Sequence, residues 1–167
     1  TLLNEITHTI RSAETSAAML QVITQTLGTA FSADYGVLRP LYNTPSQTQR
    51  CWTYQPESAP PLDEKVLAAT AIDTDSVRVL TPSELAAYQP GYSAYQQLAP
   101  KVSVLIPLTS KREPLAILAL HHCWHKHWDQ AELKQLKTLS DQAALALAQA
   151  WTYEQVQALA HRKATQI

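Results

Sequence analysis

The sequence predicts an α+β domain in which an antiparallel sheet is packed against helices from both ends of the chain. Two nearly continuous apolar strands, at residues 102–108 and 115–120, are separated by a short polar connection, a pattern typical of an antiparallel hairpin. A long amphipathic helix follows them, and another amphipathic region opens the chain. Because the apolar side of each helix must be buried, the helices and the sheet are expected to form packed layers.

The N-terminal region is expected to form two helices. Leu3, Ile6 and Ile10 recur at three- and four-residue steps, which indicates the apolar side of the first helix. The same spacing can be followed onward as one continuous helix, but an available cap at Thr15 or Ser16 favours a break and a new start. The inward residues of the second helix are then Leu20, Ile23, Leu27 and Phe31.

The sheet is expected to begin with a hairpin. Residues 35–42 read as a strand in which Pro40 indicates an edge or a bulge. Turn residues follow, and residues 48–54, with Trp52 and Tyr54 on one face, read as its antiparallel partner.

The segment 55–100 is the least regular part of the chain and is rich in proline. We expect a short helix at 63–71, a short strand at 76–80, and a small helix whose capping box is formed by Thr81 and Glu84. Irregular crossing segments of this length often form binding sites. The tyrosines of this segment are therefore candidates for contact with a ligand. The alternative is a surface crossover whose tyrosines cover the sheet.

The long C-terminal helix has a well-marked start. Asp129 is placed to cap it, Glu132 to return the hydrogen bond, and Trp128 and Leu133 to pack across the first turn. If it continues to Arg162 it is roughly 50 Å long, whereas a domain of this size has a radius of gyration of about 15 Å. Such a helix would connect modules or dimerise; the alternative is a helix that breaks near residue 149.

Composition excludes several functional classes. The 167 residues are 46% apolar and 16% charged with a net charge of −1, which is typical of one globular domain and offers no basic patch for nucleic acid. Two cysteines, Cys51 and Cys123, form no disulfide framework, and neither a secretion signal nor a membrane-length apolar run occurs, so a cytoplasmic location is expected. The chain starts at Thr1 without Met and ends while still helical, which we interpret as a fragment of a longer protein.

Both ends of the chain resemble a GAF domain, in the style of cyanobacterial sensor proteins. The resemblance rests on the strands at 104–107 and 115–123, on Trp128, Asp129 and Glu132 at the helix start, and on the pattern at 139–147. Residues 2–35 are similar to the family's entry helix and first strand, whereas 58–100 match only in length and in the strand at 77–79. The resemblance implies a PAS-like fold: a six-stranded antiparallel sheet, terminal helices on one face, and a ligand pocket under the crossing segment on the other.

The resemblance also implies a role in signalling. The whole chain, 1–167, is expected to be a single sensory or regulatory domain of a two-component or related protein, such as a histidine kinase or response regulator, with 1–14 and 150–167 as helical extensions toward neighbouring modules. Ligand or partner state would be coupled to a homodimer formed by the terminal helices. The dimer residues proposed on this basis are Leu3, Ile6, Ile10, Leu136, Ala143, Leu147 and Ala150.

Some family members bind a linear tetrapyrrole, a bilin, through a cysteine before the Val104 strand. The corresponding segment, 87–100, has no cysteine, although the sequence from His121 to Cys123 is similar to the strand end of bilin-binding members. No cofactor is therefore expected, and an unknown small molecule remains open as ligand. Two alternatives are kept: a photoreceptor domain that holds a bilin noncovalently or through Cys51, and a ligand-free dimerisation domain.

Candidate binding residues are few, and catalytic residues are not apparent. No phosphate loop, nucleophile elbow or kinase module occurs, so the domain itself is expected not to be an enzyme, although the full-length protein could be a histidine kinase. The histidines after residue 120 match no standard zinc spacing, and no metal is expected. The pocket candidates are Arg39, Trp52, Tyr54, Arg78, Tyr92, Tyr95, His121 and Cys123.

Overall fold

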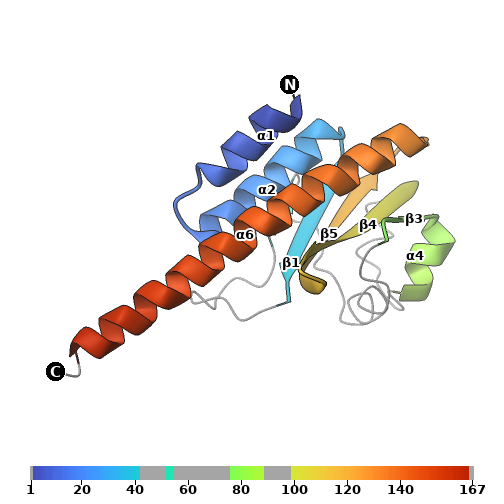
Figure 1. Ribbon diagram of the computed structural model, residues 1–167. Helices are drawn as coiled ribbons and strands as arrows, with labels where there is room; N and C mark the ends of the chain where they lie inside the picture. Colours follow the sequence, from blue (N-terminus) through green and yellow to red (C-terminus); the bar gives the residue numbers. More distant parts are fainter. Residues whose placement is uncertain (1, 42–51, 55–75, 89–98, 166–167) are drawn as a thin grey trace.

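The computed structural model describes residues 2–41, 52–54, 76–88 and 99–165, and these form helices packed on one antiparallel sheet (Figure 1). Five strands pair in the order β2-β1-β5-β4-β3. The strands are β1 (Tyr35–Pro40), β2 (Trp52–Tyr54), β3 (Arg78–Leu80), β4 (Val102–Ser110) and β5 (Glu113–His122). The helices are α1 (Leu2–Arg11), α2 (Ser16–Ala30), α4 (Pro82–Tyr88) and α6 (Gln130–Thr165).

The terminal helices lie together on one face of the sheet (Figure 1), as the sequence predicted. Helices α2 and α6 pack directly on the strands, and α1 packs on α2 and α6 as an outer layer. The resemblance implied six strands, and the described residues contain five. The expected helix at 63–71 falls outside the described residues.

The β4–β5 hairpin forms the centre of the sheet. Its register runs from Val102 opposite His122 to Ser110 opposite Glu113, so both strands are longer than predicted. Most of the polar residues expected in the connection instead pair within the two strands. The turn itself consists of Lys111 and Arg112, with φ of 52° and 66°. Two consecutive residues in this left-handed region are typical of the tight turn that matches the twist of a hairpin. An irregularity between Leu108 and Thr109 shifts the register near this turn.

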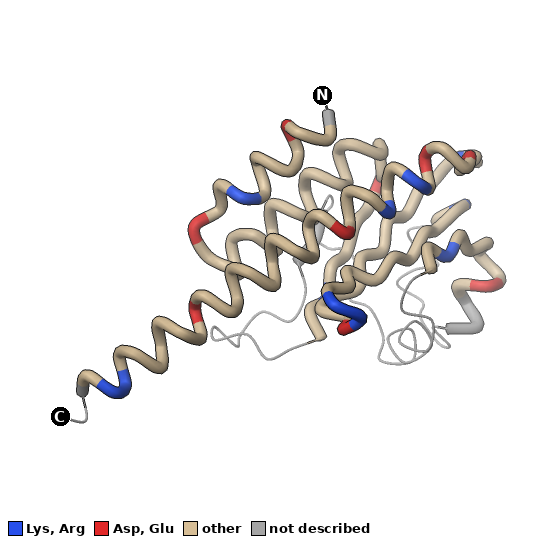
Figure 2. Tube along the Cα trace, in the orientation of Figure 1, with Lys and Arg blue, Asp and Glu red and all other residues tan. Residues whose placement is uncertain are grey.

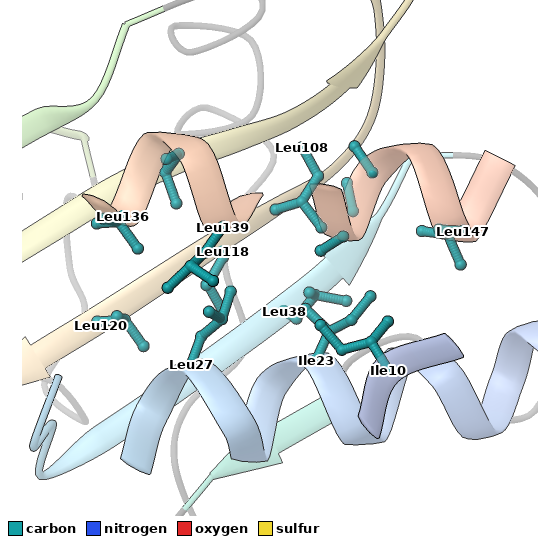
Figure 3. Close-up of a cluster of buried hydrophobic side chains, with 14 of the residues drawn as sticks. Ile10, Ile23, Leu27, Leu38, Leu108, Leu118, Leu120, Leu136, Leu139 and Leu147 are labelled. Carbon is teal, nitrogen blue, oxygen red and sulfur yellow. The ribbon is translucent and has the colours of Figure 1, made fainter. Parts of the chain in front are cut away.

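The core lies between the sheet and the helices (Figure 3). Side chains from α1 and α2 meet side chains from the strands and from α6, and the members of this layer are almost wholly buried. Burial of a large aliphatic side chain is worth about 1.5–3 kcal/mol, so this layer is the main source of stability. Its labelled members are Ile10, Ile23, Leu27, Leu38, Leu108, Leu118, Leu120, Leu136, Leu139 and Leu147.

Helix boundaries follow the predicted caps. Thr15 accepts a hydrogen bond from the Ala18 amide at 3.1 Å, which confirms the break between α1 and α2. The Glu132 amide donates to Asp129 at 2.7 Å, which confirms the start of the long helix. Thr81 and Glu84 form the predicted capping box of α4, with two reciprocal bonds of 3.2 Å.

Helix α6 is continuous for 36 residues, about 54 Å, so the alternative of a break near residue 149 is wrong. Its end extends beyond the body of the domain (Figure 1), and residues 155–164 are all exposed. Lys, Arg, Asp and Glu are distributed along the described chain without a long run of one sign (Figure 2). Among the described helices, none is both long and apolar enough to cross a membrane.

Replacing Leu139 by Ala is expected to lower the free energy of unfolding by about 2–5 kcal/mol, because a 1% exposed side chain leaves a cavity in the core. The matched control is Leu159→Ala on the same helix, where the leucine is 49% exposed and the expected change is within about 0.5 kcal/mol. Urea unfolding followed by circular dichroism measures both. Equal losses for the two variants would contradict the assignment of the core.

Candidate functional site

The face of the sheet opposite the helices, here called the distal face, carries three of the eight predicted ligand residues: Arg39, Arg78 and His121. Residues directly opposite in a ladder project from the same side of the sheet, and successive residues of one strand project from opposite sides. Leu38, Val104 and Leu118 belong to the core under the helices, so their neighbours along each strand face away from it. The distal face therefore consists of Tyr35, Val37, Arg39, Arg78, Leu80, Ser103, Leu105, Pro107, Ile117, Ala119 and His121.

The centre of the distal face is apolar and its two sides carry positive charge. Leu105, Ile117 and Ala119 are at most 1% exposed. Arg39 lies in register with Ile117 on β1, and Arg78 lies in register with Leu105 on β3. The two arginines thus stand on opposite sides of the β5–β4 centre. An arginine beside an apolar surface is suited to a partly apolar ligand that carries an anionic group.

A buried polar pair, Ser103 and His121, occupies one end of the distal face. The Ser103 Oγ lies 2.7 Å from His121 Nδ1, and the two side chains are 2% and 1% exposed. Burial, together with a smaller effect of the neighbouring His122, lowers the pKa of His121 from 6.5 to about 4. The imidazole is therefore neutral near pH 7, and with the serine hydroxyl it forms an uncharged hydrogen-bonding pair.

Cys123 lies beyond this pair at the end of β5. Its amide donates to Asp34 Oδ2 at 2.7 Å, and its thiol shares a hydrogen bond with the Tyr35 hydroxyl. Burial raises the pKa of the Cys123 thiol, and the Tyr35 bond offsets that rise only in part. Burial also raises the pKa of Tyr35, and the neighbouring Cys123 raises it further as the second-largest cause. Because the thiolate is the reactive form, a raised pKa makes Cys123 a poor nucleophile and metal ligand.

His122 projects to the opposite side of the sheet from His121, into the helix layer. Its Nε2 lies 2.8 Å from the Phe31 carbonyl, and because a carbonyl only accepts, this nitrogen carries the proton. The ring meets Trp124 and Trp128 edge-on at centroid distances of 5.4 and 5.5 Å. Burial lowers the pKa of His122, although its bond to Phe31 acts in the other direction. His122 thus joins the end of β5 to both α2 and the start of α6.

Lys126 completes this junction. Its ammonium lies 4.6 Å from the ring centre of Trp128 and 5.6 Å from that of Trp124, and it pairs with Glu132 at 2.7 Å. Its side chain is only 10% exposed, so the aromatic faces and the carboxylate replace most of its water. The histidine-rich corner is consequently a packed connection between strand and helix. Within the described ranges, no three His, Cys, Asp or Glu side chains are grouped so that they could hold a metal ion.

A groove of about 540 Å³ runs along α6 beside the β4–β5 turn. Its lining includes Leu145 and Tyr153, which are 39% and 65% exposed. Further along α6, Val156 and Leu159 are 58% and 49% exposed. The groove and these two residues present an apolar surface on the side of α6 that its own chain leaves uncovered.

The residues predicted from the sequence to form a dimer interface lie mostly inside the single chain. Most of them are buried within one chain, where they contact the sheet or the other helices: Ile6, Ile10, Leu136, Ala143 and Leu147. Leu3 and Ala150 are half-buried at the edge of that core. A dimer formed by these helices would therefore use the exposed apolar residues of α6.

The predicted pocket residues divide into three groups. Arg39, Arg78 and His121 are on the distal face, with Cys123 just beyond it. Trp52 and Tyr54 pair in register with Leu38 and Gly36, and their side chains are outside the described part of the structure. Tyr92, Tyr95 and Cys51 also lie outside the described residues.

Sequence reasoning missed Ser103 and Tyr35. Ser103 interrupts an otherwise apolar strand, and hairpin pairing places it opposite His121, so the signal was available once the register was known. Tyr35 was assigned to the first strand, but its contact with Cys123 depends on pairing between β1 and β5, which are far apart in the sequence.

Acidification is expected to destabilise the protein through His121. Because the folded state lowers its pKa, the unfolded chain binds more protons between pH 6.5 and about 4, and stability is lost as the pH falls through that range. The loss from this group is up to about 3 kcal/mol. His121→Asn should flatten the slope of unfolding free energy against pH, whereas the exposed control His127→Asn should keep it. An unchanged slope in His121→Asn would refute the assignment.

Comparison with known proteins identifies the family. The family model of the GAF domain matches residues 16–147. No match is found among curated proteins. Among the solved structures that share the fold are three GAF domains. That of an Acinetobacter phosphoenolpyruvate-protein phosphotransferase is 20% identical, with a TM-score of 0.68 over 90% of this chain and 93% of the other.

The second, the phycoerythrobilin-bound GAF domain of a cyanobacterial phytochrome, is 16% identical, with a TM-score of 0.61 over 92% and 96% of the two chains. The third belongs to a two-component sensor histidine kinase of Bacillus halodurans and is 20% identical, with a TM-score of 0.57 over 73% and 86%. These likenesses show the fold, and the family match extends from the start of α2 through most of the packed part of α6. The chain therefore belongs to the GAF domain family.

Proposed function

We propose that this GAF domain is a sensory or regulatory module of a two-component or related signalling protein, in which the state of a ligand or partner is coupled to a helical dimer interface. The observation that carries the proposal is the continuity of α6. The same helix is packed on the sheet at Leu136 and exposes apolar side chains at Val156 and Leu159. A rigid helix transmits a small displacement at one end to its other end.

The distal face is the proposed sensing side. It combines an apolar centre, the neutral pair of Ser103 and His121, and the charges of Arg39 and Arg78. This chemistry favours a small molecule with an apolar body and an anionic group, bound without reaction. The protonated thiol of Cys123 supports the same view, since it does not favour covalent chemistry. The domain itself would not be an enzyme.

The output side would be the exposed apolar surface of α6. Leu145, Val156 and Leu159 recur at intervals that keep them on one side of the helix, which is the pattern of a helix-pairing seam. Two copies related by a two-fold axis would bury this surface against each other. Adjoining modules of a longer cytoplasmic chain, such as a kinase or a response regulator, would receive the change in pairing.

Dimerisation tests this proposal. Val156→Glu introduces a charge into the seam and is expected to weaken self-association by at least about tenfold, the factor that corresponds to 1.4 kcal/mol. Gln157→Glu adds the same charge at a neighbouring exposed position off the seam and should leave association unchanged. Sedimentation velocity over a range of protein concentrations measures both. A parent chain that stays monomeric up to millimolar concentration would refute the dimer interface.

We further propose that the domain holds no bilin, although the alternative of noncovalent binding or attachment through Cys51 is directly testable. Segment 87–100 supplies no thiol, and Cys123 is protonated. Co-expression with enzymes that supply a linear tetrapyrrole is expected to give colourless protein. Coloured protein would instead support the photoreceptor alternative, and loss of the colour in denaturing gels would distinguish noncovalent binding from attachment.

A further inference from the structure

A carboxylate of α6 caps a helix from the other end of the chain. Glu154 Oε1 accepts a hydrogen bond of 2.8 Å from the Ser16 amide, and Oε2 accepts one of 2.6 Å from the Ser16 hydroxyl. The two residues are 138 positions apart, and Ser16 is 2% exposed. Both oxygens of the carboxylate are thus engaged by one residue at the start of α2.

The start of α2 requires such a partner. The first N–H groups of a helix have no acceptor within the helix, and the helix dipole makes this end partially positive. Thr15 accepts from the Ala18 amide, but α2 has no acidic residue in its first turn. Glu154 therefore supplies, from another helix, the negative charge that a helix usually carries in its own first turn. Hydrogen bonds to a carboxylate are about twice as strong as neutral ones.

Helix α2 is consequently joined to α6 at both of its ends. At the C-terminal end, Phe31 packs against Trp128, two residues before α6, with ring centres 5.5 Å apart and the ring planes tilted by 39°. At the N-terminal end, Ser16 is bound by Glu154, and nearby Arg11 of α1 donates to Gln149 at 3.1 Å. Beyond Glu154 every residue of α6 up to position 164 is exposed. Glu154 is therefore the last residue of α6, up to position 164, that is not exposed.

The rotation of α6 about its axis is set by its buried residues on the sheet, and it directs Glu154 toward α2. With about 100° of turn per residue, Leu145, Val156 and Leu159 lie within about 40° of the side opposite Glu154. As long as Glu154 is bound to Ser16, these exposed apolar residues are directed away from α2. Release of Glu154 would leave the last three turns of the helix free to bend away from α2.

We propose that the Glu154–Ser16 contact is a latch that sets the direction in which α6 leaves the domain. Closed, it holds the apolar side of the helix outward. Open, it removes this constraint while the core between α6 and the sheet stays intact. The regulatory meaning of the latch rests on the proposed function, because the latch would determine in which direction the exposed side of α6 is offered to a second copy. The latch itself is a property of the single chain.

Amide hydrogen exchange measured by NMR on the 167-residue chain tests the latch directly. In Glu154→Ala, exchange of the Ser16 amide is expected to accelerate about tenfold, since this N–H loses a charge-assisted bond. Glu154→Gln should have an intermediate effect, because the amide oxygen still accepts from Ser16, and it also serves if the alanine variant does not fold. Gln155→Ala, at an exposed position of the same helix, is the control and should leave the Ser16 amide unchanged.

A double-mutant cycle provides a second readout. Ser16→Ala removes the hydroxyl and keeps the amide, so its effect on stability should be smaller when Glu154 is already alanine. Strict additivity of the two changes, together with unchanged exchange at Ser16, would overturn the latch. Non-additivity alone without faster exchange would also overturn it, because the contact would then not hold the start of α2.

Cysteine cross-linking separates failure of the latch from failure of the dimer. In a background with Cys51→Ser and Cys123→Ser, Val156→Cys should cross-link two copies more efficiently than Gln157→Cys, and adding Glu154→Ala should reduce this preference by at least about threefold. Equal preference with and without Glu154 would refute the latch as a control of the direction of α6. Absence of cross-links at either position would refute the dimer interface, while the exchange experiment would still decide on the latch.

Discussion

The burial of α2 and α6 against one face of the antiparallel sheet is the constraint on which the rest of this domain depends. Leu38, Leu118 and Leu120 present one side of the sheet to the helices, and all three are fully buried. Because successive side chains of a strand point to opposite faces, His121 and Arg39 then lie on the other side of the sheet. The candidate ligand face and the protruding α6 are both consequences of this single packed layer.

The two adjacent histidines illustrate how one strand serves both faces. His121 pairs with Ser103 on the distal face, and His122 binds the Phe31 carbonyl in the helix layer. Burial keeps both imidazoles neutral, but only His122 belongs to the junction with Trp128 and Lys126. The end of β5 is thus fixed to the start of α6 and at the same time contributes to the proposed sensing side.

Much of this architecture was predictable because it depends on local patterns. The caps at Thr15, Thr81 and Asp129 and the central hairpin are encoded within short segments, and each was confirmed. The contacts that join distant segments were not predictable. The bond of Ser16 to Glu154 and that of Tyr35 to Cys123 require the tertiary arrangement, and burial of Ile10 and Leu136 in one chain could not be distinguished by spacing from a dimer seam.

The strand order has a consequence for how the chain folds as it is synthesised. Strand β1 pairs with β5, and α2 packs on α6, so the first third of the chain finds its partners only in the last third. Contacts of such long sequence separation form slowly, whereas the β4–β5 hairpin can form alone. On the ribosome, α1, α2 and β1 therefore emerge with their apolar sides uncovered, and protection by a chaperone is most valuable until α6 has been translated.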